Sequence, residues 1–210
     1  DIRFIIIFFL SILAYFISIY LVKDHYEDHE ESFCDVSSHI SCTKVRRSVY
    51  SELFSVSVAI FGSIYNISSV FLSFFAFLQT NQQKCNEYTS ALFYWSIFGA
   101  TFIFYLICAE IILEALCPFC TLLHVIQFII LYISWKLFDK HVEPTLVSSS
   151  SSFRLMKSLF STIYSMKFWL IVFIIINLIP LIYFNFYHNQ EGEVNIYESA
   201  PESFAQCVRS

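Results

Sequence analysis

The chain has few charged residues for its length. Only 14% of its 210 residues are Asp, Glu, Lys or Arg, whereas a soluble domain contains about 25%. The charges also cluster between long apolar segments, which is the pattern of a membrane protein. The net charge is −5 and the sequence has no basic stripe, so nucleic acid is not expected as a partner.

Alternating strands of about ten residues, which a membrane β-barrel needs, are also absent. Backbone groups in lipid have to pair within their own segment, so we predict an all-α integral membrane protein. Uncharged spans of about twenty residues cross a hydrocarbon core of roughly 30 Å. Five such spans cover residues 4–22, 53–79, 88–109, 115–135 and 168–187. The polar segment 80–87 is expected to be a turn, and the mildly apolar SELFSVSVA, residues 51–59, is interpreted as a half-helix in the membrane interface.

Two cysteine pairs are expected on the same membrane face. Cys34 and Cys42 lie in an acidic loop, and Cys117 and Cys120 lie where the fourth span begins. The chain crosses the membrane twice between the two pairs, which returns it to the same side. Seven of the twelve Lys and Arg residues fall on the other side, a small excess that predicts a non-cytosolic location for the cysteines. Disulfide chemistry is expected in such a compartment.

The sequence CPFC at the start of a helix favours reactive thiols. Unpaired amides and the helix dipole stabilise a thiolate there, and Pro118 fits the first helical turn. One interpretation is a redox relay, in which the loop pair exchanges disulfides with Cys117 and Cys120. A quinone is then the obvious lipid-soluble oxidant. The alternatives are a zinc site, which needs tighter ligand spacing than that of Cys34 and Cys42, and a static disulfide framework.

Three segments resemble the vitamin K epoxide reductase family: CDVSSHISCTKVRRS, SELFSVSVAIFG and AEIILEALCPFC. The resemblance covers nearly the whole chain and implies a thiol–quinone oxidoreductase with a four-helix bundle around the quinone. It implies that Cys117 and Cys120 are the active-site pair, with Cys120 nearest the quinone. It also implies that Cys34 and Cys42 are the shuttle pair, in which Cys34 meets the external reductant and Cys42 reaches Cys117. Ser48 matches the family's loop Ser or Thr and is assigned to the catalytic residues with the cysteines.

Two positions depart from the animal members of this family. Animal enzymes carry a quinone-binding Asn three residues before a Phe-Gly pair, and here the position before Phe61 and Gly62 is Val58, which donates no hydrogen bond. They also carry a Tyr four residues after the second active-site cysteine, where this chain has His124. Both positions look more like the bacterial and plant branch, which uses ordinary quinones to make disulfides. The alternatives are a vitamin K epoxide reductase and a non-enzymatic membrane protein with structural disulfides.

The quinone pocket is expected to have apolar and aromatic walls. The candidate quinone-binding residues are Phe54, Val58, Phe61, Phe119 and His124. His124 lies one turn beyond Cys120 and either donates to a quinone oxygen or makes a polar helix–helix contact. The acceptor is expected to be ubiquinone, menaquinone, phylloquinone or vitamin K.

Residues 1–187 are therefore expected to form the transmembrane catalytic domain. Residues 188–210 form a tail that we interpret as the start of a thioredoxin-like domain, because such a domain follows the fifth helix in the bacterial and plant branch. The electron donor is then a fused thioredoxin-like domain or a separate thioredoxin-fold protein, and the lipid bilayer surrounds the spans. The serine run 148–152 and the Phe-, Ile- and Tyr-rich composition favour the endoplasmic reticulum membrane. A bacterial inner membrane or a thylakoid suits the chemistry equally well.

Overall fold

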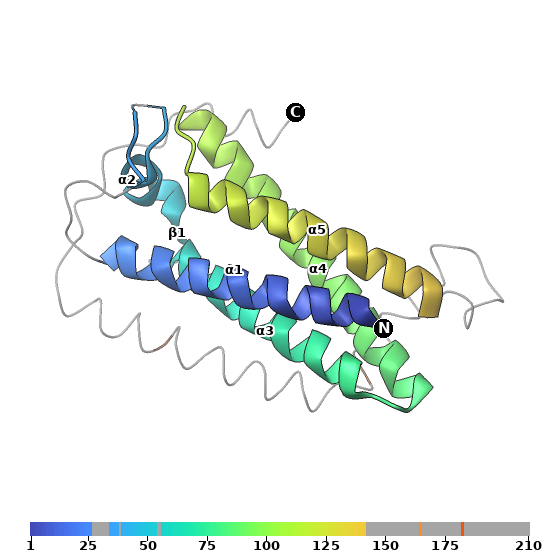
Figure 1. The fold of residues 1–210 in the computed structure, drawn as a ribbon. Helices are drawn as coiled ribbons and strands as arrows, with labels where there is room; N and C mark the ends of the chain where they lie inside the picture. Colours follow the sequence, from blue (N-terminus) through green and yellow to red (C-terminus); the bar gives the residue numbers. More distant parts are fainter. Residues whose placement is uncertain (27–33, 38, 54–55, 142–163, 165–181, 183–210) are drawn as a thin grey trace.

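The computed structural model of the chain describes residues 1–26, 34–37, 39–53, 56–141, 164 and 182. In this part of the chain, long helices α1 (Ile2–Tyr26), α3 (Val58–Leu78), α4 (Gln82–Ile112) and α5 (Pro118–His141) form an up-and-down bundle (Figure 1). Each packs on two neighbours, in the ring order α1, α3, α4, α5 and back to α1. These described helices are all long and apolar enough to span a membrane. The predicted all-α membrane bundle is thus confirmed, and the predicted fifth span, 168–187, falls almost wholly outside the described residues.

Short elements between α1 and α3 form a cap at one end of the bundle. They are helix α2 (Cys42–Arg46), the 3₁₀ helix η1 (Val49–Ser51) and an antiparallel pair of strands, β1 (Glu52–Leu53) and β2 (Val56–Ser57). The half-helix expected for SELFSVSVA was wrong, because this segment forms η1 and the strand pair. The α-helix begins only at Val58, where the Ser57 hydroxyl caps it by accepting from the Ala59 amide at 3.3 Å.

The turn between α3 and α4 is also shorter than expected. Asn81 caps α4 by accepting from the amide of Gln83 at 2.9 Å, so the helix starts at Gln82 and takes in most of the predicted 80–87 turn. At the other end, Glu114 adopts a left-handed conformation with φ 48. The Ala115 amide donates to the Glu110 carbonyl at 3.2 Å, which closes the helix in the manner of a Schellman motif.

Small polar residues let the helices approach closely. The Ser18 hydroxyl lies 3.5 Å from the position that a Cβ on Gly62 would take, and it accepts from the Asn66 amide at 3.0 Å. Ser96 and Ser134 join α4 to α5 at 3.0 Å. Small residues have this role in membrane bundles, where burial of apolar surface gives little driving force. Large apolar side chains such as Phe9 and Phe104 are exposed on the outer faces of the bundle instead, as expected for surfaces that meet lipid.

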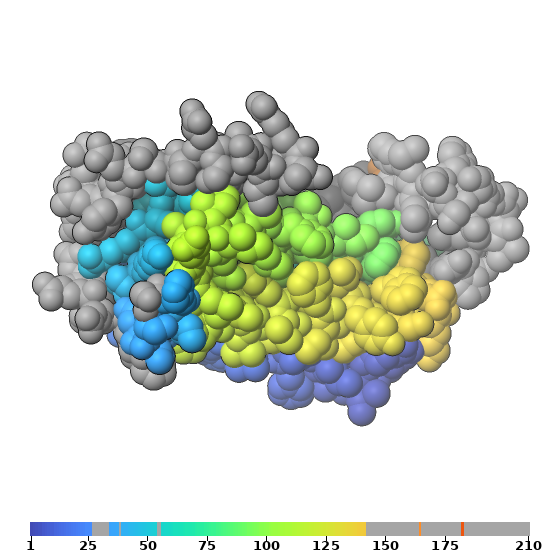
Figure 2. All heavy atoms as spheres, turned by 90° about the horizontal axis from the view of Figure 1, so that it is seen from above, coloured from blue at the N-terminus to red at the C-terminus, as the bar shows by residue number. Residues whose placement is uncertain are grey.

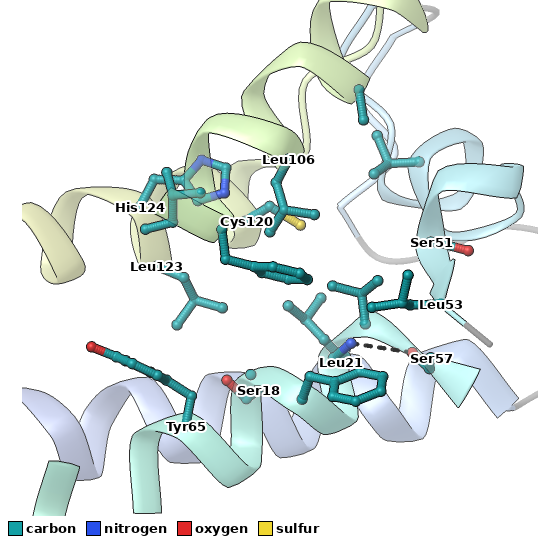
Figure 3. A pocket seen from close by; sticks show the side chains of 18 of the residues that line it. Ser18, Leu21, Ser51, Leu53, Ser57, Tyr65, Leu106, Cys120, Leu123 and His124 are labelled. Carbon is teal, nitrogen blue, oxygen red and sulfur yellow. Dashed lines mark hydrogen bonds between the residues drawn. The ribbon is translucent and has the colours of Figure 1, made fainter. Parts of the chain in front are cut away.

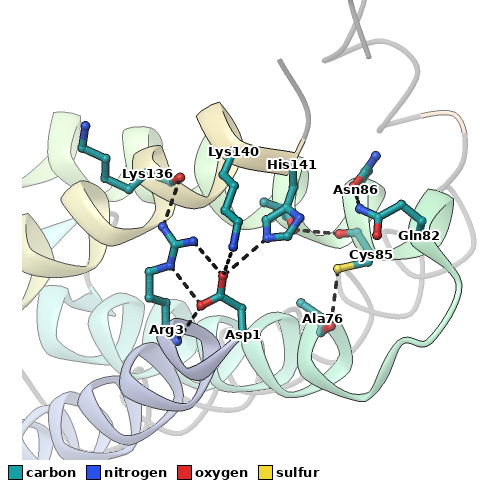
Figure 4. A network of polar contacts seen from close by, with 10 residues as sticks. Asp1, Arg3, Ala76, Gln82, Cys85, Asn86, Lys136, Lys140 and His141 are labelled. Carbon is teal, nitrogen blue, oxygen red and sulfur yellow. Dashed lines mark hydrogen bonds and ion pairs between the residues drawn. The ribbon is translucent and has the colours of Figure 1, made fainter. Parts of the chain in front are cut away.

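The bundle end opposite the cap is held by charges. Asp1 Oδ2 lies 2.7 Å from Arg3 Nη2 and 3.1 Å from Lys140 Nζ, and it also faces His141 at 3.5 Å (Figure 4). These contacts join the start of α1 to the end of α5. Figure 2 shows the other end, where residues of the 34–53 segment pack against the junction of α4 and α5.

Candidate active site

Three of the four predicted redox cysteines form a buried cluster under the cap. Cys34 and Cys42 are joined by a disulfide, and Cys117 and Cys120 are free thiols. The Sγ atoms of Cys42 and Cys117 are 3.4 Å apart, although 75 residues separate them in sequence. Cys34, Cys42 and Cys117 are 6%, 2% and 1% exposed. The two pairs therefore lie together at the same end of the bundle, as counting the crossings predicts.

A short backbone pairing brings Cys42 to Cys117. Ile40 and Leu116 form a parallel bridge, in which the Leu116 amide donates to the His39 carbonyl at 2.8 Å and the Ser41 amide donates to the Leu116 carbonyl at 3.2 Å. Because Cys42 follows Ser41 and Cys117 follows Leu116, this register sets the two sulfur atoms side by side.

Asp35 orders the start of α2 next to the disulfide. Its carboxylate accepts from the Ser41 hydroxyl at 2.8 Å, from the Thr43 amide at 3.1 Å and from the Thr43 hydroxyl at 2.5 Å. Ser41 in turn caps α2 by accepting from the Lys44 amide at 3.0 Å. Cys42 is therefore held in the first turn of a capped helix, where amide dipoles favour a thiolate.

The CPFC segment is arranged to stabilise a Cys117 thiolate. The Cys120 amide donates to Cys117 Sγ at 3.3 Å. Hydrogen bonding from the Cys120 thiol, and then from backbone amides, holds the pKa of the Cys117 thiol below its usual range, although burial and the Glu110 carboxylate act in the opposite direction. Glu110 Oε1 also accepts from the Cys117 amide at 3.4 Å. These contacts favour the thiolate form of Cys117 over that of an ordinary buried cysteine.

Cys120 faces a cavity of about 460 Å³ inside the bundle (Figure 3). This volume lies within the range of small-molecule sites, about 300–1,000 Å³. The lining is mostly apolar and comes from all of the long helices and from the cap. Cys42 and Cys120 both line the cavity, whereas Cys34 and Cys117 do not. The sulfur contacts therefore run from Cys34 to Cys42 and from Cys42 to Cys117, and each of the two pairs has one member on the cavity wall.

His124 supplies an unused polar atom on the wall of this cavity. It lies one turn after Cys120 on α5 (Figure 3) and is 6% exposed. Its Nε2 atom is buried and has no hydrogen-bond partner among the described residues. A buried polar group without a partner is costly, so this atom is available for a ligand that brings a complementary oxygen.

Polar side chains also gather at the inner end of the cavity. Gln127 donates to the Tyr65 hydroxyl at 2.7 Å and to the Ser96 carbonyl at 3.0 Å. The Tyr65 ring stacks on Trp95 with centroids 5.2 Å apart. A Cβ on Gly99 would lie 2.5 Å from this ring, so only glycine allows this approach at position 99.

The remaining predicted site residues have different surroundings. Val58, Phe61 and Ser48 line the cavity, and the Ser48 hydroxyl donates to the Val45 carbonyl at 2.7 Å, which closes the last turn of α2. Phe119 does not line the cavity, contrary to expectation. It packs on the cysteine cluster and on Tyr20, with ring centroids 5.1 Å apart, because consecutive residues on a helix point about 100° apart. Phe54 lies outside the described residues.

Several lining residues were not predicted from the sequence, namely Asp24, Tyr65, Asn66 and Gln127. Glu110 and Arg46 also line the cavity. Asn66 and Gln127 carried a usable signal, because amides inside apolar spans point to the bundle interior. The zinc interpretation finds no support in the described part of the chain, where no group of three or more His, Cys, Asp or Glu residues could hold a metal.

Comparison with known proteins gives one result that agrees with this geometry. The model of the vitamin K epoxide reductase family matches residues 5–135, which is more than half of the chain and includes α1, the cap, both cysteine pairs and His124. None of the curated proteins compared with the chain matches it. The chain therefore belongs to the vitamin K epoxide reductase family, a family of integral membrane oxidoreductases.

Proposed function

We propose that this protein is a thiol–quinone oxidoreductase that forms disulfides in a thioredoxin-fold partner. The observation that carries the proposal is the chain of sulfur atoms from Cys34 to the cavity. Cys42 Sγ is bonded to Cys34 and lies 3.4 Å from Cys117 Sγ, and Cys120 lines the cavity. Thiol–disulfide exchange accounts for the contact between the two pairs as well as for the four positions.

The first transfer takes electrons from the partner to the loop pair. A partner thiolate attacks Cys34, and Cys42 leaves as a thiolate. The second partner thiol then attacks the mixed disulfide, which releases Cys34 as a thiol and leaves the partner with a new disulfide. Two electrons have entered the protein in this step, and the proton of the second partner thiol has passed to Cys34.

The second transfer passes these electrons to the pair beside the cavity. The Cys42 thiolate attacks Cys117 of a Cys117–Cys120 disulfide, and Cys120 leaves as a thiolate. Cys34 then attacks Cys42 and releases Cys117, whose lowered pKa makes it a good leaving group. The product has an oxidised loop pair and a reduced CPFC pair, which is the arrangement in the structure.

The cavity suits a quinone as the final acceptor. A bound quinone takes up two electrons and two protons, which is what one dithiol gives when its disulfide forms. Cys120 supplies the thiol at the cavity wall, and His124 offers its unpartnered Nε2 to a quinone oxygen. Val58 and Phe61 supply apolar contacts, and the surrounding helices exclude water from the reacting thiol.

We favour ordinary quinones over vitamin K epoxide as the substrate, as in the bacterial and plant branch. Val58 is 8% exposed on the cavity wall and offers no hydrogen bond at the position where animal enzymes have Asn. The electron donor is a separate thioredoxin-fold protein or a fused thioredoxin-like domain that begins in residues 188–210. The cysteine pairs face the non-cytosolic side, and the endoplasmic reticulum is our first choice of membrane.

The test is quinone-dependent oxidation of a reduced thioredoxin-fold protein by the purified enzyme. Variants with alanine at Cys34, Cys42, Cys117 or Cys120 are expected to lose turnover. Cys85→Ala is the matched control, because Cys85 is a buried thiol in the first turn of α4. Equal turnover in all variants would support a structural role for the disulfides. The same conclusion would follow if the Cys34–Cys42 and Cys117–Cys120 pairs both stayed oxidised in the presence of the partner.

A further inference from the structure

Two buried charges join the cap to the end of α1. Arg46 Nε, on α2, lies 3.4 Å from Asp24 Oδ2, in the last turn of α1, and the two side chains are 7% and 8% exposed. The Arg46 guanidinium also donates to the Asp24 backbone carbonyl. A second contact lies next to the first, where His25 Nε2 faces Glu52 Oε1 at 3.4 Å.

Arg46 is also tied to the cap behind it. The Ser51 hydroxyl donates to the Arg46 carbonyl, and α2 is only five residues long, from Cys42 to Arg46. Arg46 is therefore one turn from Cys42 on the same helix, so the position of its side chain fixes the orientation of the cysteine. Both Asp24 and Arg46 line the cavity at its cap end.

Because both charges are buried, this ion pair restrains the relative position of its two residues. A surface pair constrains its partners weakly, whereas a buried charge that loses its partner is strongly disfavoured. The planar guanidinium also contacts two groups of one residue, because its Nε lies 3.4 Å from the Asp24 carboxylate and its Nη1 donates to the Asp24 carbonyl. An Arg46 held in this way restrains α2 to one placement on α1.

We propose that Asp24 and Arg46 are a positioning pair, which holds α2 on α1 so that Cys42 stays within exchange distance of Cys117. This inference rests on the proposed function. The backbone bridge at Leu116 sets the register of the loop on one side of Cys42, and the ion pair anchors the other side. Neither charge takes part in the sulfur chemistry, and the pair matters most when the Cys34–Cys42 disulfide is open and no longer constrains the loop.

The experiment measures Cys42–Cys117 proximity without a quinone or a partner. In a background with Cys34→Ala and Cys120→Ala, Cys42 and Cys117 are the two cluster cysteines left, and a mild thiol oxidant joins them. Their disulfide is identified by mass spectrometry after digestion, and its rate of formation is recorded. Because no turnover is needed, a failure of the proposed quinone reaction leaves this measurement readable.

Arg46→Gln and Asp24→Asn are expected to slow cross-linking by about tenfold or more, since small misplacements of reacting groups have large effects on rate. Lys44→Gln is the matched control, because it removes a positive charge from an exposed position of the same helix, and it is expected to react like the parent. Arg46→Lys keeps the charge without the fork and is expected to fall between them. The double variant Asp24→Asn, Arg46→Gln is expected to cross-link no more slowly than the slower single variant, because both changes remove the same contact.

A purely structural ion pair gives a different result. It would lower the unfolding temperature of Arg46→Gln while the folded protein cross-linked at the parent rate, and that outcome overturns the proposal. If Arg46→Gln does not fold, Arg46→Lys and Asp24→Asn decide the question, and parent rates in both of them also overturn it.

Discussion

Replacing His124 by leucine should stabilise the protein and weaken quinone binding at the same time. The His124 side chain is 6% exposed, and its Nε2 atom has no hydrogen-bond partner in the described structure. Leaving a buried polar group unsatisfied costs about 1–3 kcal/mol. Leucine fills a similar volume without a polar atom, so the free energy of unfolding of quinone-free His124→Leu should rise by about 1 kcal/mol.

The same change removes the group that we assign to a quinone oxygen. A hydrogen bond of this kind contributes about 0.5–1.5 kcal/mol, which corresponds to a loss of affinity of about two- to tenfold. Because a ligand at a given concentration stabilises the folded state more when it binds more tightly, excess quinone should raise the unfolding temperature of the parent more than that of His124→Leu. His124→Gln retains a donor and an acceptor and serves as the control.

Thermal unfolding in detergent, with and without a soluble naphthoquinone, measures both effects. We predict that His124→Leu is more stable than the parent without quinone and that excess quinone reduces or reverses this difference. This prediction is refuted if His124→Leu is less stable than the parent without quinone and if quinone raises the unfolding temperature of both proteins equally. That result would show that His124 makes a structural contact between helices.

Three further predictions test the surroundings of the cysteines and the inner end of the cavity. Hydrogen bonding from Cys120 lowers the pKa of Cys117, so Cys120→Ala should raise the pH midpoint of exchange between Cys42 and Cys117. Cys120→Ser keeps a hydroxyl donor and should shift this midpoint less. Glu110→Gln should shift the same midpoint down, because the Glu110 carboxylate raises the pKa of Cys117; an unchanged midpoint contradicts this. Gly99→Ala should destabilise the protein by about 1–3 kcal/mol, since the new Cβ would lie 2.5 Å from the Tyr65 ring. Gly62→Ala, whose Cβ would lie 3.5 Å from Ser18 Oγ, is its control and should be near neutral in the same unfolding assay.

The helices of the bundle could be predicted from the sequence because lipid leaves the backbone no other choice. Uncharged runs had to become helices, and counting crossings brought Cys42 and Cys117 to one face. The ends of the helices were harder, since they depend on local caps. The Asn81 side chain caps α4 by accepting from the amides of Gln83 and Lys84, so the helix starts within a segment whose polar composition predicts a turn.

The cap was not predictable in the same way. Its strands are two residues long, and the pairing of Ile40 with Leu116 joins segments that are far apart in the chain. The partner of Arg46, Asp24, is on another helix 22 residues earlier in the chain, and both side chains are buried. Such long-range contacts leave no local pattern in the sequence.

The central claim is that electrons leave the protein only through Cys120. Its most direct test is to reduce all cysteines of the purified protein, add excess quinone, and follow disulfide formation by mass spectrometry in the parent, Cys42→Ala and Cys120→Ala. In the parent, we predict that the Cys117–Cys120 disulfide forms first and the Cys34–Cys42 disulfide second. In Cys42→Ala only the Cys117–Cys120 disulfide should form. In Cys120→Ala quinone should leave Cys34 and Cys42 reduced. Quinone-dependent formation of the Cys34–Cys42 disulfide in Cys120→Ala would contradict the relay.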